Sequence, residues 1–166
     1  MPDTLTAETV FTTVDSPIGP LTLMGREGHL TNLVMHEQAH AVVPPEGSRR
    51  DDRAFDPVTE QLDEYFGGDR IEFDVPLELA GTEFQRAVWA QLCAIPYGET
   101  ISYGELARRV GNPRASRAVG SANGRNPIAV IVPCHRVIAG DGSLGGYGGG
   151  LDRKTTLLDL ERGRTA

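Results

Sequence analysis

The sequence is poor in cysteine and has no long hydrophobic run. Its 166 residues contain only two cysteines, Cys93 and Cys134, too few for the disulfide framework of a small secreted domain. No segment approaches the ~18 consecutive apolar residues of a membrane helix, and residues 1–12 lack the basic start and apolar run of a secretory signal. We therefore expect a cytoplasmic protein with two free thiols. Because no cysteine or histidine lies at the spacing of metal ligands, we expect no metal site.

Positive charge is scarce in the first part of the chain. Residues 1–99 contain 6 Arg or Lys against 18 Asp or Glu, a net charge of −12, whereas residues 100–166 contain 10 against 5, a net charge of +5. A phosphate backbone responds to positive charge within about one Debye length, so the local excess matters more than the overall charge of −7. Charge alone leaves two interpretations of the second part open, a nucleic-acid surface and an ordinary solvated face.

The first 80 residues indicate a small α/β domain. The stretch "VFTTVDSPIGPLTLMG" has two β-rich runs around turn residues, and "GREGHLTNLVM" adds another turn and run. Together they predict a small antiparallel meander. The stretch "FDPVTEQLDEYFGG" predicts a helix that covers this sheet, with Asp56 as N-cap, Pro57 at its first position and Gly67 at its end. The polar, proline-containing stretch between them predicts a mobile loop near residues 37–54.

The middle of the chain predicts an extended segment followed by a helix. The segment "IEFDVPLEL" alternates apolar residues from Ile71 onward, which indicates one buried face. In "TEFQRAVWAQLCAIPYG", Thr82 and Gln85 predict a capping box at the start of the helix. Cys93 lies four residues after Trp89 on the apolar stripe of this helix, which favours a small buried hydrophobe over a reactive thiol.

Two short helices follow. In "SYGELARRVGNPRASRAVGSANG", Ser102 and Glu105 predict a second capping box, and Gly111 ends the first helix. Asn112 and Pro113 are expected to begin the next one. Two helices joined by a tight, glycine-containing turn are typical of a helix-turn-helix.

The second helix of this pair carries mainly small side chains. They are Ala115, Ser116, Ala118, Gly120, Ser121 and Ala122, and they are surrounded by Arg114, Arg117 and Arg125. A core helix would carry larger hydrophobic residues, whereas small side chains permit close approach to a partner. We interpret this surface as one that enters a groove of DNA and makes arginine contacts there.

The stretch "IVPCHRVI" places Cys134 and His135 next to each other in an apolar run. Adjacent strand residues point to opposite faces, so the pair needs a sharp turn, a bridging water or a third group to act together. Glu161 lies beside the apolar stripe of the last predicted helix, "LDRKTTLLDLERG", where it could orient the imidazole. A Cys–His–Glu relay would raise the thiolate fraction of Cys134. The spacing leaves open an inert buried cysteine beside a surface histidine.

The predicted architecture is therefore α/β with two domains. Residues 1–80 form a small antiparallel sheet with a covering helix and include the loop near 37–54. Residues 81–166 form a mostly helical domain with a helix-turn-helix and a short active-site strand around Cys134.

Three segments resemble the alkylguanine-DNA alkyltransferases, which repair O6-alkylguanine in DNA. They are "FQRAVWAQLCAIPYGETISYGELA", "NPRASRAVGSANGRNPIAVIVPCHRVI" and "GYGGGLDRKTTLLDLE", and together they span about residues 82–161. The motif "PCHRV" preceded by "NP" is highly specific. Residues 1–80 fit the N-terminal domain of this family by position and by their β-then-α order.

The resemblance implies a role for each residue of the relay. Cys134 would be the acceptor of the alkyl group, activated by His135 through a water and by Glu161. Tyr103 would donate a hydrogen bond to N3 of the guanine, which helps the base to leave in its neutral form. Asn126 would pin the turn that brings the helix and the active-site strand together.

The resemblance also implies how the damaged base is held. Arg117 would fill the space that a flipped base leaves in the stack, and the helix-turn-helix would enter the minor groove. The carbonyls of Cys134 and Val137 would read the guanine amino group, and Tyr147 would wall the pocket. Gly148 occupies a position where some relatives carry serine, so only its backbone N–H is available there.

The function expected from the resemblance is direct repair of DNA. The alkyl group of O6-alkylguanine, or of O4-alkylthymine, in duplex DNA would move irreversibly and stoichiometrically to Cys134 after base flipping. No cofactor is expected, and the free protein is expected to be a monomer. Two alternatives belong to other classes: a module that binds alkylated DNA without repairing it, which Cys134 argues against, and a multiple-turnover cysteine hydrolase.

Overall fold

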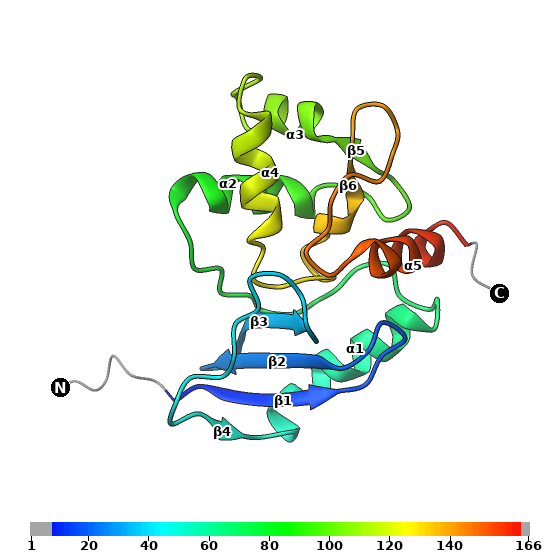
Figure 1. Cartoon of the computed structure of the whole chain (residues 1–166). Helices are drawn as coiled ribbons and strands as arrows, with labels where there is room; N and C mark the ends of the chain where they lie inside the picture. Colours follow the sequence, from blue (N-terminus) through cyan, green and yellow to red (C-terminus); the bar gives the residue numbers. More distant parts are fainter. Residues whose placement is uncertain (1–7, 164–166) are drawn as a thin grey trace.

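The computed structural model describes residues 8–163 (Figure 1). The elements in chain order are β1 (Val10–Val14), β2 (Leu21–Arg26), β3 (His29–Met35), β4 (Arg49–Arg50), the 3-10 helix η2 (Arg53–Phe55), α1 (Asp56–Phe66), α2 (Glu83–Cys93), β5 (Ile101–Ser102), α3 (Tyr103–Arg109), α4 (Ser116–Gly124), the 3-10 helix η3 (Cys134–Arg136), β6 (Val137–Ile138) and α5 (Leu151–Glu161). None of the helices in this part of the chain is long and apolar enough to cross a membrane.

The N-terminal sheet has four strands in the order β3-β2-β1-β4. The pairs β1–β2 and β2–β3 are antiparallel, as predicted, but β4 runs parallel to β1, so the sheet is mixed. Strand β4 lies inside the segment predicted to be a mobile loop, and that prediction is wrong there. Its backbone is fixed at the sheet edge by bonds from the Arg49 N–H to the Thr9 carbonyl (3.1 Å) and from the Asp51 N–H to the Phe11 carbonyl (3.0 Å). Edge pairing of this kind needs no apolar pattern, and the sequence therefore gave no sign of it.

Helix α1 covers the sheet, as predicted (Figure 1). Its buried face consists of Val58, Leu62 and Tyr65, at the spacing of an amphipathic helix. The start differs by one residue from the prediction, because Asp56 is the first helical residue and the N-cap is Phe55, at the end of η2. The chain has already turned into a helical conformation before Asp56, so the carboxylate caps nothing.

The edge strand β3 joins the two halves of the chain. On one side of the sheet edge, Leu30 forms a parallel bridge with Leu77 of the extended segment. Further along, the Leu33 N–H donates to the carbonyl of residue 127 (2.9 Å), and the N–H of residue 129 donates back to the Leu33 carbonyl (3.1 Å). The extended segment thus lies against the core as predicted, except that Ile71 at its start is exposed, because the chain has not yet reached β3 there.

Helix α2 begins with the predicted capping box between Thr82 and Gln85. Trp89 is buried against α4, and its indole N–H donates to the Ala122 carbonyl (2.8 Å). Cys93, however, is exposed, so the prediction of a buried hydrophobe is wrong. It is the last residue of α2, whose buried residues are Val88, Trp89 and Leu92, so the buried stripe does not include it.

Helix α3 starts at a serine cap but lacks the second half of the predicted capping box. The Ser102 hydroxyl accepts from the Glu105 N–H (3.0 Å). The Glu105 carboxylate does not return to the cap, because it forms ion pairs with Arg108 (2.7 Å) and Arg109 (3.0 Å). Two cations within a single turn outcompete a backbone donor for this carboxylate.

Helix α4 packs against α3 and completes the predicted pair of helices. It begins at Ser116, with Ala115 as N-cap. The prediction that Asn112 and Pro113 begin this helix is wrong. Both residues lie in the turn between the helices, where the Asn112 carbonyl accepts from the Ala115 N–H (2.9 Å).

Candidate active site

Cys134 lies in a tight turn and not on a strand. The residues Cys134, His135 and Arg136 form the 3-10 helix η3, and strand β6 begins only at Val137. The short active-site strand is present, paired in parallel with β5, but it follows the cysteine. The sharp turn removes the objection that neighbouring strand side chains point to opposite faces.

The segment before Cys134 is held by a buried asparagine. The Asn126 amide donates to the Val132 carbonyl (2.7 Å), and its oxygen accepts from the Ile128 N–H (3.0 Å). These bonds close the loop between α4 and η3. Within it, Val130 has a φ of 71°, in the left-handed region that a β-branched residue rarely adopts. The loop that carries the cysteine is therefore backbone-strained and pinned from within.

His135 and Glu161 form a buried pair. The His135 Nε2 lies 2.8 Å from the Glu161 carboxylate, and both side chains are almost completely buried. Burial lowers the pKa of His135 and outweighs the opposing effect of Glu161, so the imidazole is neutral near pH 7. An ionised carboxylate can only accept, which places the imidazole proton on Nε2 and the free lone pair on Nδ1.

Two further residues hold the Glu161 carboxylate, and neither was expected from the sequence. The Arg136 guanidinium donates to both carboxylate oxygens (2.8 and 2.9 Å), and the Tyr65 hydroxyl of α1 donates to Oε2 (2.5 Å). Burial alone would raise the pKa of Glu161, but the bonds from His135 and Arg136 lower it well below its usual range. Glu161 is therefore an anion at neutral pH.

A cavity of about 290 Å³ opens in front of Cys134. Most of its lining comes from α4, η3 and the glycine-rich loop (residues 145–150), and one wall comes from the N-terminal half. The lining includes Met35, Ala39, Tyr103, Asn126, Cys134, Tyr147, Gly148 and Gly149. The structure thus brings Cys134, Asn126, Tyr103, Tyr147 and Gly148 of the predicted site to one cavity.

The Cys134 thiol is protonated at rest. Burial raises the pKa of Cys134, and the nearby polar groups of Asn126, Tyr147 and Lys154, which favour the anion, do not outweigh it. His135 and Glu161 therefore do not keep Cys134 in its thiolate form at rest. The thiol proton has to be removed during the reaction, when a substrate fills the cavity.

Lys154 is the only lysine in the sequence and is fully buried. Its ammonium donates to the carbonyls of Val137 (2.7 Å), Leu144 (2.5 Å) and Gly146 (3.1 Å). Burial lowers the pKa of Lys154 to about 8. This lysine ties the glycine-rich loop to β6. Its place on the same stripe of α5 as Leu157 and Glu161 was the signal that could have revealed it.

The two backbone carbonyls expected to read the base both accept side-chain bonds within the protein. The Val137 carbonyl accepts from the Lys154 ammonium (2.7 Å), and the Cys134 carbonyl accepts from the Asn123 amide (3.3 Å).

Tyr103, the first residue of α3, lies at the mouth of the cavity. Its hydroxyl is 3.5 Å from the Gly146 carbonyl, at the limit of a hydrogen bond. Burial raises the pKa of Tyr103, which keeps the hydroxyl a donor. The Tyr103 hydroxyl can therefore donate a hydrogen bond to a group that enters the cavity.

The predicted DNA surface lies on and around α4. Arg114, Ser116, Arg117, Ser121 and Arg125 are exposed, and Ala115 is half-buried. Within residues 8–163, none of these three arginines takes part in an ion pair with an acidic side chain. The surface thus offers three free cations beside small side chains.

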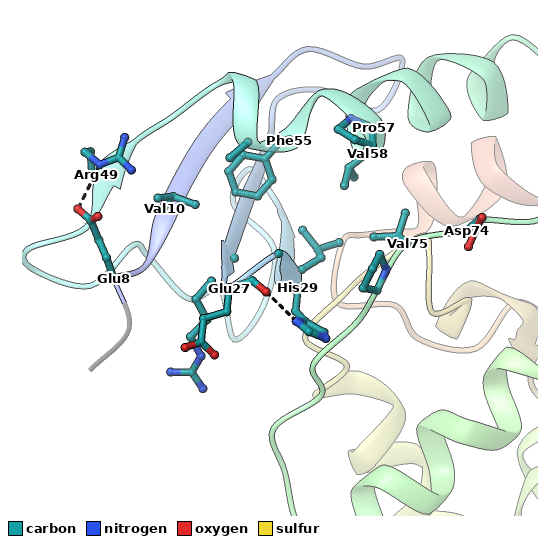
Figure 2. Close-up of a pocket in the computed structure, with 16 residues that line it drawn as sticks. Glu8, Val10, Glu27, His29, Arg49, Phe55, Pro57, Val58, Asp74 and Val75 are labelled. Atoms are coloured by element: carbon teal, nitrogen blue, oxygen red, sulfur yellow. Dashed lines mark hydrogen bonds and ion pairs between the residues drawn. The ribbon is translucent and has the colours of Figure 1, made fainter. Parts of the chain in front are cut away.

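A second cavity, of about 310 Å³, lies on the N-terminal half, away from Cys134 (Figure 2). Its charged rim is largely paired: Arg49 contacts Glu8 (3.2 Å), and His29 Nδ1 lies 3.1 Å from the Glu27 carbonyl. Neither cysteine is part of its lining. The chemistry of the described chain is concentrated in the cavity at Cys134.

Comparison with known families covers nearly the whole described chain. Residues 83–163 match the family described as "6-O-methylguanine DNA methyltransferase, DNA binding domain". Residues 9–79 match the family described as "6-O-methylguanine DNA methyltransferase, ribonuclease-like domain".

Individual proteins give the same result. The methylated-DNA–protein-cysteine methyltransferase of Mycolicibacterium paratuberculosis is 59% identical over 152 residues, 92% of each chain, and that of Mycobacterium tuberculosis is 56% identical over 158 residues, 93% of each. The crystal structure of Mycobacterium tuberculosis OGT in complex with DNA matches with a TM-score of 0.88 at 55% identity, covering 94% of each chain.

Proposed function

The chain belongs to the 6-O-methylguanine DNA methyltransferase family and is a methylated-DNA–protein-cysteine methyltransferase, and on that premise we propose that Cys134 is its alkyl acceptor. The observation that carries this assignment is the buried His135–Glu161 pair beside a cysteine that opens into a cavity. In the proposed reaction the sulfur attacks the alkyl carbon, a C–S bond forms, and the bond between that carbon and O6 of guanine breaks. The thioether has no easy route to hydrolysis, so each protein reacts once.

The thiol of Cys134 also has to lose its proton when the C–S bond forms. His135 Nδ1, which has no hydrogen-bond partner among the described residues, takes the Cys134 proton through a water. Glu161 stabilises the imidazolium that forms, because its carboxylate faces Nε2. The proton that left the thiol then passes from the imidazolium through the water to the departing guanine, so atoms and charge balance, and the hydrogen bond from Tyr103 to N3 favours this neutral leaving group.

The base-holding part of the proposal uses the remaining cavity residues. The Cys134 and Val137 carbonyls accept from the guanine amino group, and the Tyr147 ring and the Gly148 backbone wall the pocket. Asn126 keeps the loop that carries Cys134 in register with α4. O4-alkylthymine offers a similar alkyl oxygen and is the second proposed substrate class.

The proposed partner is duplex DNA bound through its minor groove by the surface on α4. Small side chains at Ala115, Ser116 and Ser121 permit close approach, and Arg114 and Arg125 contact phosphates. The alkylated base is flipped into the cavity because O6 is inaccessible inside the stack. Arg117 replaces the flipped base in the stack.

We further propose that the free protein is a monomer and that its two domains comprise residues 1–80 and 81–166. It works in a reducing compartment such as the cytoplasm, since the reaction needs the acceptor cysteine as a free thiol.

The decisive experiment counts transferred methyl groups. Duplex DNA that carries labelled O6-methylguanine is incubated with the wild-type protein, with Cys134→Ser and with the matched control Cys93→Ala. We expect a plateau near one methyl per protein for the wild type and Cys93→Ala, and no transfer for Cys134→Ser with its DNA binding retained. A methyl group found on Cys93 contradicts the assignment of the acceptor, and continued release of product indicates a hydrolase.

A further inference from the structure

One wall of the cavity at Cys134 is built by the N-terminal half of the chain. The end of β3 and the residues that follow it line the cavity together with Tyr147 and the glycine-rich loop. The residues concerned are Met35, Gln38, Ala39 and His40. None of these residues belongs to the relay or to the DNA surface. They can affect the proposed reaction through the size of the space that they leave for the alkyl group.

We propose that this segment, residues 35–40, sets the size of the alkyl group that Cys134 accepts, with Ala39 and Met35 as the specificity-determining residues. The proposal rests on the proposed function, because it concerns the substrate of the same cysteine. It assigns to the N-terminal half a direct part in substrate choice.

The segment is docked on the cavity by a backbone bond. The Ala39 N–H donates to the Gly148 carbonyl (2.7 Å), so the two walls are linked at this point. The segment is also closed on itself, because the Gln38 side chain accepts from the Met35 N–H (2.6 Å) and the Gln38 N–H donates to the Met35 carbonyl (3.2 Å). A wall fixed in this way limits the volume of a ligand and does not simply move aside.

The glycines of the opposite wall show how closely the segment approaches. A side chain at position 149 would place its Cβ 2.6 Å from Met35 Cε and 2.8 Å from Met35 Sδ, so Met35 fills the space that Gly149 leaves. A Cβ at position 148 would lie 3.7 Å from the Ala39 carbonyl oxygen and 3.9 Å from the Ala39 Cβ, which is ordinary contact. Gly148 and Ala39 are therefore direct neighbours in the lining of the cavity, and their small size leaves space there.

The two side chains control the open volume in opposite senses. Ala39 is small and lies at the rim, so a longer side chain there narrows the entrance above Gly148. Met35 is buried and flexible, so its truncation enlarges the cavity beside Gly149. Pockets of this kind discriminate among ligands by a few methylene groups of size.

The test measures the preference between two alkyl groups on the same DNA. One duplex carries O6-methylguanine and another of the same sequence carries O6-benzylguanine, and both compete for a limiting amount of protein. The ratio of benzyl to methyl found on Cys134 cancels changes in DNA affinity and in the fraction of folded protein.

We expect Ala39→Leu to lower this benzyl-to-methyl ratio about tenfold relative to the wild type, and Met35→Ala to raise it several-fold. The matched control is Ala41→Leu, the same substitution at an exposed residue outside the cavity lining, which should leave the ratio unchanged. Met35→Leu, which nearly conserves volume, should also leave it nearly unchanged.

The outcomes separate the inference from the function on which it rests. Normal methyl transfer with an unchanged ratio in both Ala39→Leu and Met35→Ala overturns the inference alone. Absence of alkyl groups on Cys134 in the wild type overturns the proposed function. An equal change of the ratio in Ala41→Leu would assign the effect to the loop as a whole and would also contradict the role given to Ala39.

Discussion

The arginines of the N-terminal sheet domain and those around α4 differ in their partners. In the N-terminal half, four arginines are neutralised locally, by the pairs Arg26–Glu78, Arg49–Glu8, Arg50–Asp52 and Arg70–Glu64. Around α4, Arg114, Arg117 and Arg125 are exposed and make no ion pair within the described chain. The comparison shows that the arrangement of free charge, and not the net charge of −7, indicates where a polyanion binds.

The halves differ less in their contribution to the site. Every proposed reacting group lies after residue 100, yet the Tyr65 hydroxyl of the N-terminal half holds the carboxylate of the relay. Ala39 of the same half is bonded to the pocket loop. The acidic N-terminal half thus contributes groups that hold Glu161 and the pocket loop in place.

The largest effect that sharpens this comparison is expected at Glu161. In Glu161→Gln, the imidazole loses the anion that stabilises its protonated form, so we expect the methyl-transfer rate at pH 7.5 to fall about 10–100-fold. Arg136 also loses a buried partner, so the unfolding free energy should fall by about 3 kcal/mol. DNA affinity should be nearly unchanged, because Glu161 is buried and does not belong to the exposed surface on α4. Transfer kinetics, chemical unfolding and DNA titration measure the three quantities.

The same variant has a defined pH signature. In the wild type, the lowered pKa of His135 stabilises the fold above about pH 6.5, and the lowered pKa of Glu161 adds stability above about pH 4.3. Both contributions are lost as the pH falls through these ranges. Glu161→Gln should lose stability less steeply than the wild type below about pH 4.3. Parallel stability curves would show that the fold does not lower the pKa of Glu161.

A smaller effect is expected at Tyr65, which tests whether the N-terminal half supports the relay. Tyr65→Phe keeps the ring packing but removes one bond to a charged group, so we expect a loss of about 2 kcal/mol in unfolding free energy. Transfer to free O6-benzylguanine should slow only several-fold, since His135 and Arg136 still hold the carboxylate. Tyr97→Phe is the matched control, because Tyr97 makes no hydrogen bond to Glu161. Equal effects in both variants would remove the special role of Tyr65.

The smallest effect concerns the free and the paired arginines. Arg125→Ala should weaken binding to undamaged duplex DNA several-fold at 0.1 M salt and lower the slope of log affinity against log salt by about 1. Arg50→Ala, in which the lost cation was already paired with Asp52, should leave the slope unchanged. Fluorescence titrations over a salt series measure both slopes. Equal slopes in the two variants would contradict the placement of the DNA surface on α4.

The sequence was informative wherever the cause of structure is local. The caps at Thr82 and Ser102 fixed the starts of α2 and α3, because an N-cap acts within one turn. A contact between His135 and Glu161 was also predicted, and the structure shows it.

The missed features depend on partners that are far apart in the chain. Tyr65 and Glu161 are 96 residues apart, and no spacing rule connects them. Arg136 stood inside the quoted motif, but its role became visible only when η3 turned it toward α5. Cys93 was misjudged because the spacing from Trp89 does not show how wide the buried stripe of α2 is.

The bridges along β3 have a consequence for how the protein folds. Leu30 pairs with Leu77 and Leu33 with Ile128, so the edge strand is completed only when segments from distant parts of the chain have arrived. The buried core is continuous across this seam. Such long-range closure makes folding slow and cooperative, and we expect a single unfolding transition for the whole chain. Residues 81–166 alone would leave the partner of Ile128 missing, and should not fold into a reactive fragment.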